Sequence, residues 1–384
     1  MTGSPLSVVV APDKFKGSLS AAEVADTVTD VLKGYLPDAA IMAMPIADGG
    51  EGTVALALDA GFEPVTVIVT GPLAEPVDAM YARRGHEAVI EMAAAAGMVL
   101  LPGEPTPEMA STATSAGVGE LLLHAIDHGA TAITLGLGGS ACTDGGAGMA
   151  QRLGAEVTTT GGEPVGLGGA ALGAVASVDL ESMRARLAGV EITIACDVDN
   201  PLLGPEGSAA IYGPQKGADA STVALLDQSL SVWNTALHAA TGTDVSATPG
   251  VGAAGGLSTP LIVAGVATIR PGAETVLGFT GLGGNIDSAD LVVVGEGSLD
   301  EQSLRGKAPV AVARRASAAG AHVVAVVGQC VLTDPQIHDA GIDQVLAVAD
   351  REPDLDTAIA NAKSIVHDMV DEVGPQLVQH FQTL

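Results

Sequence analysis

The sequence predicts an α/β protein of two domains, one built on a parallel sheet and one of mixed α/β structure inserted into it. Hydrophobic residues make up 47% of the 384 residues and aromatic residues only 2%, so the core must consist mainly of Val, Leu, Ile and Ala. Such a core suits helices layered on sheets. Short β-branched runs alternate with helical patterns near both ends of the chain, whereas the middle is patterned differently.

The two ends of the chain share a pattern of a short apolar strand, a polar loop and a helix. We expect them to form one Rossmann-like domain from residues 1–64 and 280–384, with ligand-binding loops after the strand ends. The expected elements are strand 7–12, helix 21–32, strand 40–46, helix 51–60, a strand entering segment 290–301, helix 309–319, strands 322–327 and 344–349, and a helix from 355 to about 382.

The middle of the chain, residues 65–279, is expected to form the inserted mixed α/β domain. From 65 to 93, extended runs separated by proline and charge favour antiparallel strands, and 101–109 is a proline-rich link. The other elements expected here are helices 118–127, 148–153 and 221–240 and strands 132–137 and 191–195.

The balance of charge excludes several classes of partner. With 45 acidic and 16 basic residues, the formal net charge is −29, which argues against nucleic acid or an anionic membrane surface. No apolar run approaches a membrane span, and the three cysteines show no CxxC spacing. We therefore expect a cytoplasmic monomer or homodimer that binds a small-molecule substrate.

Four of the six lysines lie in glycine-rich or turn-like segments, which suggests that cations are reserved for an anionic ligand. These are Lys14, Lys16, Lys216 and Lys307. In so acidic a chain, the expected ligand carries phosphate. Lys16, Lys216 and Lys307 are the candidate catalytic cations.

Two glycine-rich runs, ADGGEGT at 47–53 and GLGGSACTDGGAGM at 136–149, also contain carboxylates. Glycine lets backbone amides approach an anion closely, and carboxylates supply oxygen ligands for Mg²⁺. We therefore expect a Mg-nucleotide, with Asp48, Glu296 and Asp300 as metal ligands. The residues expected to bind substrate or nucleotide are Asp13, Ser18, Gly49, Gly50, Glu51, Gly139, Ser140, Thr143, Asp144, Gly145, Gly295 and Gly297.

Several of these acids have structural alternatives. Asp144 can cap a helix instead of serving the ligand. Asp199, before Asn-Pro, can simply initiate a turn. Asp197 follows a buried-looking strand directly, where a carboxylate without a purpose is costly, so it is the first choice for catalytic base.

Taken together, the motifs resemble those of the bacterial glycerate kinase family, type I. They run in order from about residue 8 to about residue 350: APDKFKGSLSA, PIADGGEGT, GLGGSACTDGGAGMAQRLGA, ACDVDNPLLGPEG, IYGPQKGA, GAAGGL and VVVGEGSLDEQSLRGK. The resemblance implies ATP-dependent phosphorylation of D-glycerate, with 2-phosphoglycerate as the usual product, and a two-domain α/β fold with one Rossmann-like domain. We expect Mg²⁺-assisted transfer in a cleft between the domains.

The chain departs from the family pattern at Lys14, Cys142, Thr143, Ser298 and Ser303, where the family commonly has PDSFKGS, GSATNDGG and GEGRxDxQT. Ser298 stands where the family commonly has an arginine, and Lys14 could supply the positive charge that is lost there. A kinase for another small hydroxy acid and a non-catalytic phosphometabolite-binding protein remain alternatives. The chain lacks the P-loop motif, and its first strand is not followed by the GxGxxG of a dinucleotide-dependent oxidoreductase.

Overall fold

The computed structural model describes residues 5–15, 17–46, 50 and 52–382. The chain divides into two compact units, unit 1 of Met1–Asp48 with Val276–Leu384 and unit 2 of Gly49–Thr275. The first division lies before the one expected after residue 64, because helix α2 (Thr53–Asp59) packs against strands β4 and β5 of unit 2. Each unit is described by itself below.

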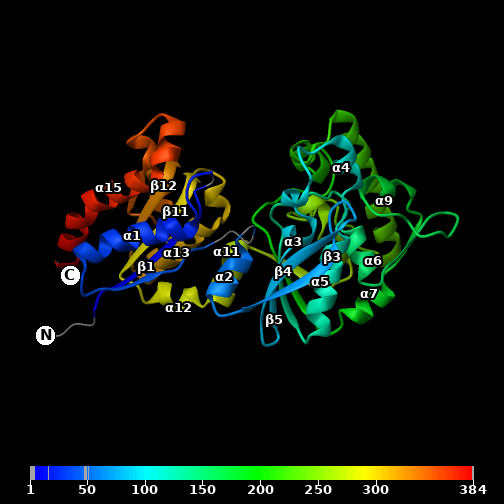
Figure 1. The fold of residues 1–384 in the computed structure, drawn as a ribbon, viewed down its shortest axis with the longest axis horizontal. Helices are drawn as coiled ribbons and strands as arrows, with labels where there is room; N and C mark the ends of the chain where they lie inside the picture. Colours follow the sequence, from blue (N-terminus) through cyan, green and yellow to red (C-terminus); the bar gives the residue numbers. More distant parts are fainter. Residues whose placement is uncertain (1–4, 16, 47–49, 51, 383–384) are drawn as a thin grey trace. The chain divides into compact units, whose positions relative to one another are not determined.

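Unit 1 is built on a five-stranded sheet in the order β13-β12-β11-β1-β2, in which every pair is parallel. This order places the topological switch point between β1 and β11, where the connections leave toward opposite faces. Figure 1 shows α1 and α15 in this unit, and the two helices pack against each other. The elements are β1 (Ser7–Pro12), α1 (Ala21–Tyr35), β2 (Ala40–Ala43), α12 (Leu282–Asp287), β11 (Leu291–Leu299), η5 (Ser303–Arg305), α13 (Ala308–Ala319), β12 (His322–Cys330), α14 (Asp334–Asp339), β13 (Gln344–Ala347), η6 (Val348–Asp350) and α15 (Leu355–Gln382).

The central strands of this sheet are apolar on both faces, as strands covered by helices on both sides must be. Val8, Val9 and Val10 of β1 are fully buried, and the first four residues of β11 are buried as well. Helix α1 begins with a capping box, in which the Ser20 hydroxyl accepts from the Glu23 amide and the Glu23 carboxylate accepts from the Ser20 amide.

Unit 2 is built on a six-stranded mixed sheet in the order β10-β9-β6-β5-β4-β3. Strands β3, β4 and β5 pair antiparallel, and the remaining pairs are parallel. Its elements are α2, β3 (Glu63–Thr70), β4 (Pro76–Arg84), β5 (Glu87–Glu91), α3 (Ala93–Ala96), η1 (Met98–Leu100), α4 (Pro107–Thr112), α5 (Ala116–Asp127), β6 (Ala132–Gly136), α6 (Ala147–Arg152), β7 (Glu156–Thr158), η2 (Gly169–Ala174), β8 (Ser177–Asp179), α7 (Glu181–Arg186), β9 (Glu191–Ala195), α8 (Ser208–Tyr212), η3 (Pro214–Lys216), α9 (Ala220–Thr241), η4 (Ala253–Gly256), α10 (Thr259–Val263) and β10 (Ala267–Arg270), with α11 (Gly272–Thr280) crossing into unit 1.

The predicted fold class, a parallel-sheet domain with an inserted mixed α/β domain, is confirmed. Some details differ from expectation. Strand β11 continues through Glu296 to Leu299, where a loop was expected, because this stretch pairs with β12 as far as Cys330, the last residue of that strand. The helices α11 and α12 were not expected, since a glycine at 281 interrupts their apolar pattern. No helix that the structure describes is long and apolar enough to cross a membrane.

Candidate functional site

Strands β1 and β11 of unit 1 diverge at the switch point of the sheet, where the sequence placed Asp13, Gly295 and Glu296. The Asp13 amide donates to the Gly295 carbonyl oxygen over 2.7 Å, which holds the two strand ends together. A Cβ on Gly295 would lie 2.7 Å from the Val326 carbonyl oxygen, so no other residue fits this position without a shift. The carboxyl ends of parallel strands at a switch point are where such sheets bind ligands.

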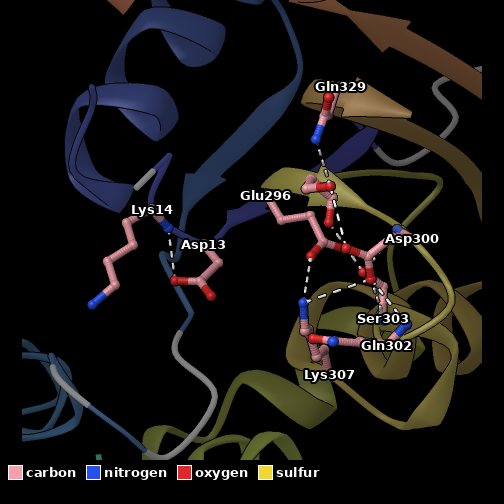
Figure 2. A network of polar contacts seen from close by, with 9 residues as sticks. Asp13, Lys14, Glu296, Asp300, Gln302, Ser303, Lys307 and Gln329 are labelled. Carbon is pink, nitrogen blue, oxygen red and sulfur yellow. Dashed lines mark hydrogen bonds and ion pairs between the residues drawn. The ribbon is translucent and has the colours of Figure 1, made fainter. Parts of the chain in front are cut away.

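Three charged side chains from the end of β11 and the following segment meet at this edge, and we call Glu296, Asp300 and Lys307 the β11 cluster. The Lys307 ammonium lies 3.7 Å from a Glu296 carboxylate oxygen and 4.0 Å from one of Asp300. Figure 2 shows the three side chains pointing toward one another. Lys307 is placed by the turn that begins α13, immediately before Ala308. The structure thus brings together three of the predicted site residues.

Glu296 is the most perturbed acid of the β11 cluster. Its side chain is only 7% exposed, and its Oε1 atom has no hydrogen-bond partner among the described residues. Burial raises the pKa of Glu296 to about 7, although the neighbouring Ser303 and Lys307 partly offset the effect. A buried carboxyl with one oxygen that lacks a hydrogen-bond partner among the described residues, at the carboxyl edge of a sheet, is typical of a functional position.

Asp300, in contrast, is held as a carboxylate by its own loop. Its Oδ1 accepts from the amides of Gln302 and Ser303, and the Ser298 hydroxyl lies 3.3 Å from Oδ2. Burial alone would raise the pKa of Asp300, but Lys307 and these hydrogen bonds bring it below its ordinary value. Asp300 is therefore anchored in place and ionised.

The departures from the family pattern are visible in the same loop. Ser298 stands where the family commonly has an arginine, and its hydroxyl accepts a hydrogen bond from the Gln329 side chain at 3.1 Å. The Lys14 side chain, offered from the sequence as a replacement charge, points away from Glu296 and Asp300 (Figure 2). Among the lysines that the structure describes, Lys307 is the one that forms ion pairs with these two carboxylates.

A second group of predicted residues lies in unit 2, in the loop of residues 139–146 that follows β6, here named the Gly-rich loop. Asp144 is fully buried at its centre, and burial raises its pKa. Its carboxylate accepts from the amide and hydroxyl of Ser115 and from the amides of Gly146 and Gly148. Since Ser115 precedes α5 and Gly146 precedes α6, Asp144 joins the starts of two helices.

The other predicted residues of the Gly-rich loop are also enclosed. Gly139 and Gly145 have positive φ of 72° and 60°, which the turns at either end of the loop require. Ser140 is buried, and Thr143 is fully buried with a hydroxyl that has no partner among the described residues. The Gly145 carbonyl accepts from the indole of Trp233, which is buried in the core.

Lys216 was predicted to face a ligand, but its side chain is buried in the structure. It is 1% exposed, and its ammonium donates to the Cys142 carbonyl oxygen over 2.6 Å, beneath the Gly-rich loop. Burial lowers the pKa of Lys216 to about 8, with Cys142 and Asp144 opposing the shift. In this conformation Lys216 supports the loop from inside and is not open to a ligand.

Asp197, the candidate base, follows β9 in unit 2 and is half-buried. Its Oδ1 accepts from the Gly272 amide at 2.8 Å, at the start of α11. The GAAGGL motif at 252–257, which the sequence singled out without giving it a role, joins the segment after β9 to the Gly-rich loop: the Gly252 amide donates to the Asn200 carbonyl, and the Gly255 carbonyl accepts from the Gly145 amide.

Other residues were missed or lie outside the description. Glu91, at the end of β5, accepts from the amides of Gly52 and Val54 and so fixes the start of α2 after the run containing Gly50. The sequence signal that could have identified Glu91 is an acidic residue directly after the apolar run AVI. The predicted residues Lys16, Asp48, Gly49 and Glu51 lie outside the described residues.

Comparisons with known proteins decide among the chemistries this site allows. A family model described as the glycerate kinase family matches residues 8–378. The chain belongs to the glycerate kinase family. A protein of Escherichia coli (strain K12) named glycerate 2-kinase is 40% identical over 361 residues, which cover 93% of this chain and 94% of that protein.

Further relatives of this glycerate kinase family chain agree. A Bacillus subtilis (strain 168) protein named glycerate kinase is 39% identical over 360 residues, 93% of this chain and 94% of that one. A crystal structure from Salmonella typhimurium LT2, provisionally named glycerate kinase 2, matches with a TM-score of 0.83 and 38% identity, covering 99% of this chain and 100% of that one. The predictions of the family and of an enzyme are confirmed.

Proposed function

We propose that the protein is an ATP-dependent kinase that phosphorylates D-glycerate, with 2-phosphoglycerate as product. The observation that carries this proposal is the β11 cluster, where Lys307 faces Glu296 and Asp300 at the switch point of a parallel sheet. The names of the relatives, glycerate kinase and glycerate 2-kinase, support the substrate. Membership of a kinase family supports a nucleotide as phosphoryl donor.

Phosphoryl transfer depends mainly on positioning and on neutralising charge that spreads over the transferring group. Lys307 is proposed to supply that positive charge, because its ammonium is partly exposed at the strand edge. The Asp13 and Gly295 backbones, joined by a hydrogen bond, would fix the loop on the other side of the switch point. Asp197 stays the predicted base, and Lys16 stays a predicted cation.

Mg²⁺ is proposed to be held through Glu296 and Asp300. Within residues 5–15, 17–46, 50 and 52–382, no group of three or more His, Cys, Asp or Glu side chains is arranged to hold a metal. Two carboxylates are nevertheless sufficient, because Mg²⁺ usually binds through one or two carboxylates together with substrate phosphates. The Oε1 atom of Glu296, which is buried and has no hydrogen-bond partner among the described residues, fits such a role. When bound, the ion would neutralise phosphate charge.

The remaining predictions concern the setting of the reaction. We propose that the Gly-rich loop of unit 2, with Gly139, Ser140, Thr143 and Gly145, contributes to substrate binding through its backbone. Catalysis in a cleft between the domains, a cytoplasmic location and a monomer or homodimer stay predictions.

The proposal is tested by following ADP release from Mg-ATP with D-glycerate, with L-glycerate, lactate and glycerol as other acceptors, and with no acceptor. We expect release that depends on D-glycerate and a product with the phosphorus resonance of 2-phosphoglycerate. Turnover of another hydroxy acid without turnover of glycerate would favour the broader kinase. Nucleotide binding without turnover of any acceptor would favour the non-catalytic alternative.

A further inference from the structure

We propose that unit 1 binds the nucleoside part of the phosphoryl donor in a pocket beside the β11 cluster. This inference rests on the proposed kinase function, because it gives the pocket to the nucleotide that the reaction needs. The pocket has a volume of about 320 Å³, and its wall includes Phe15 and Ser18 of the loop after β1 and Gly297 of β11. Ligand pockets in proteins typically begin near this size.

The floor of the pocket is backbone. Gly297 and Gly328 are opposite each other in the register of β11 and β12, since Glu296 pairs with Val327 and Ser298 with Gln329. A Cβ on Gly328 would overlap the Gly297 carbonyl oxygen, so the close approach of the strands requires glycine there. Two adjacent glycines at the tips of two strands leave a flat surface on which a planar ring can lie.

The opposite wall is apolar and belongs to α15 and the segment before it. Ala358 and Ala362 are small and buried, while Leu355 is 71% exposed and Ile359 is 38% exposed. These two large side chains stand at the mouth of one pocket and would be covered by an occupant. Polar groups also line it, namely the side chains of Gln329 and Glu352.

This combination fits a purine nucleoside better than it fits the acceptor. A base has apolar faces for the walls and polar edges for Gln329 and Glu352, whereas glycerate is small, anionic and without an apolar face. Glu352 would repel its carboxylate, and the apolar part of the wall, with Leu355, Ala358 and Ile359, would offer it no hydrogen bonds.

The position of the pocket relative to the β11 cluster also fits a nucleotide. Gly297 lines the pocket, and Glu296 directly precedes it in the strand, so the two residues face opposite sides of the sheet. A nucleotide whose base lies in the pocket would cross the carboxyl edge of β11 at the switch point, and its phosphates would reach Lys307.

The test compares two ligands by calorimetry on the full-length protein, Mg-ADP and inorganic tripolyphosphate. The double variant Leu355→Asp/Ile359→Asp places charge at the mouth of the pocket, at positions exposed enough to keep the fold. We expect its affinity for Mg-ADP to fall about tenfold or more while its affinity for tripolyphosphate stays that of the wild type. The matched control is Val99→Asp, at an 82% exposed apolar position of unit 2, which should change neither.

Ala358→Phe, which fills the pocket, should likewise weaken Mg-ADP only; if it fails to fold, the exposed double variant decides. Unchanged Mg-ADP affinity in the double variant, equal losses for both ligands, or a wild type that does not bind Mg-ADP would overturn the inference. Glycerate turnover by the wild type is scored separately. If the double variant loses Mg-ADP binding selectively but the wild type does not turn over glycerate, the kinase proposal is wrong and the nucleoside pocket stands. If the wild type turns over glycerate but the double variant binds Mg-ADP normally, the kinase proposal stands and the nucleoside pocket is wrong.

Discussion

The ammonium of Lys216 donates to the carbonyl oxygen of Cys142 over 2.6 Å, and both residues are buried. The hydrogen bond joins η3 to the Gly-rich loop across 74 positions of sequence. A buried ammonium is costly to leave unpaired, so this contact ties the conformation of the loop to the position of one lysine. In the described structure Lys216 therefore contacts the Gly-rich loop itself, and its role as a catalytic cation stays a prediction.

The buried lysine makes stability depend on pH. The pKa of Lys216 falls from 10.5 to about 8 on folding, so the unfolded chain binds more protons between those values and the free energy of unfolding rises with pH there. We expect the difference in this free energy between wild type and Lys216→Met to grow from pH 8 to pH 10.5 by on the order of 3 kcal/mol. Urea unfolding at pH 8, 9 and 10.5 measures it.

The control for this experiment is Lys33→Met, because the Lys33 side chain is 62% exposed at the end of α1. It should leave the pH dependence of unfolding as in the wild type. Parallel curves for wild type and Lys216→Met would show that the lysine does not titrate as a buried group.

Asp144→Asn should destabilise unit 2. The carboxylate accepts five hydrogen bonds, from Thr114, Ser115, Gly146 and Gly148, and an amide can accept with only one of its two head-group atoms. We expect a loss of about 2 to 4 kcal/mol in the free energy of unfolding, measured by urea titration at pH 7. Asp30→Asn, at a side chain 79% exposed, serves as the control and should stay within about 0.5 kcal/mol of wild type. An equally small loss for Asp144→Asn would contradict the role of Asp144 in joining the starts of α5 and α6.

The loop at 253–256 offers a matched pair of backbone tests. Ala254 has φ of 51°, a left-handed conformation that costs a non-glycine residue about 1 to 2 kcal/mol. Ala254→Gly relieves this strain, but the greater entropy of glycine in the unfolded chain partly offsets the gain, so stability should stay unchanged or rise by up to about 1 kcal/mol. Gly255→Ala, at φ of 73°, would drive a Cβ into the Cys142 carbonyl and should destabilise. Thermal melting compares them, and the reverse order would refute the strain at Ala254.

Much of the fold follows from local sequence patterns. Val8, Val9 and Val10 form a β-branched run that is buried on both faces, and the capping box of Ser20 and Glu23 marks the start of α1 within one residue. Those signals lie within a few residues of one another. They need no knowledge of the rest of the chain.

The site is less predictable, because its properties arise from distant contacts. The sequence places Lys307 and Glu296 in one segment, but their approach depends on β11 continuing through Glu296, which pairing with β12 causes. The burial of Lys216 depends on the Gly-rich loop, far away in sequence. Lys216 and Lys307 both lie next to a glycine in the sequence, so the local pattern is the same for both. Only the tertiary structure shows that Lys307 is partly exposed and Lys216 is buried.

The most direct test of the account is the turnover number of Lys307→Met for ADP release in saturating Mg-ATP and D-glycerate, beside Lys33→Met. A charge-assisted contact to a transferring phosphoryl group is worth about 1.5 to 3 kcal/mol, so kcat should fall by about 10- to 150-fold while the melting temperature stays near that of the wild type. The Lys33→Met control should turn over at the wild-type rate. A Lys307→Met enzyme with wild-type kcat would contradict the placement of phosphoryl transfer at the β11 cluster.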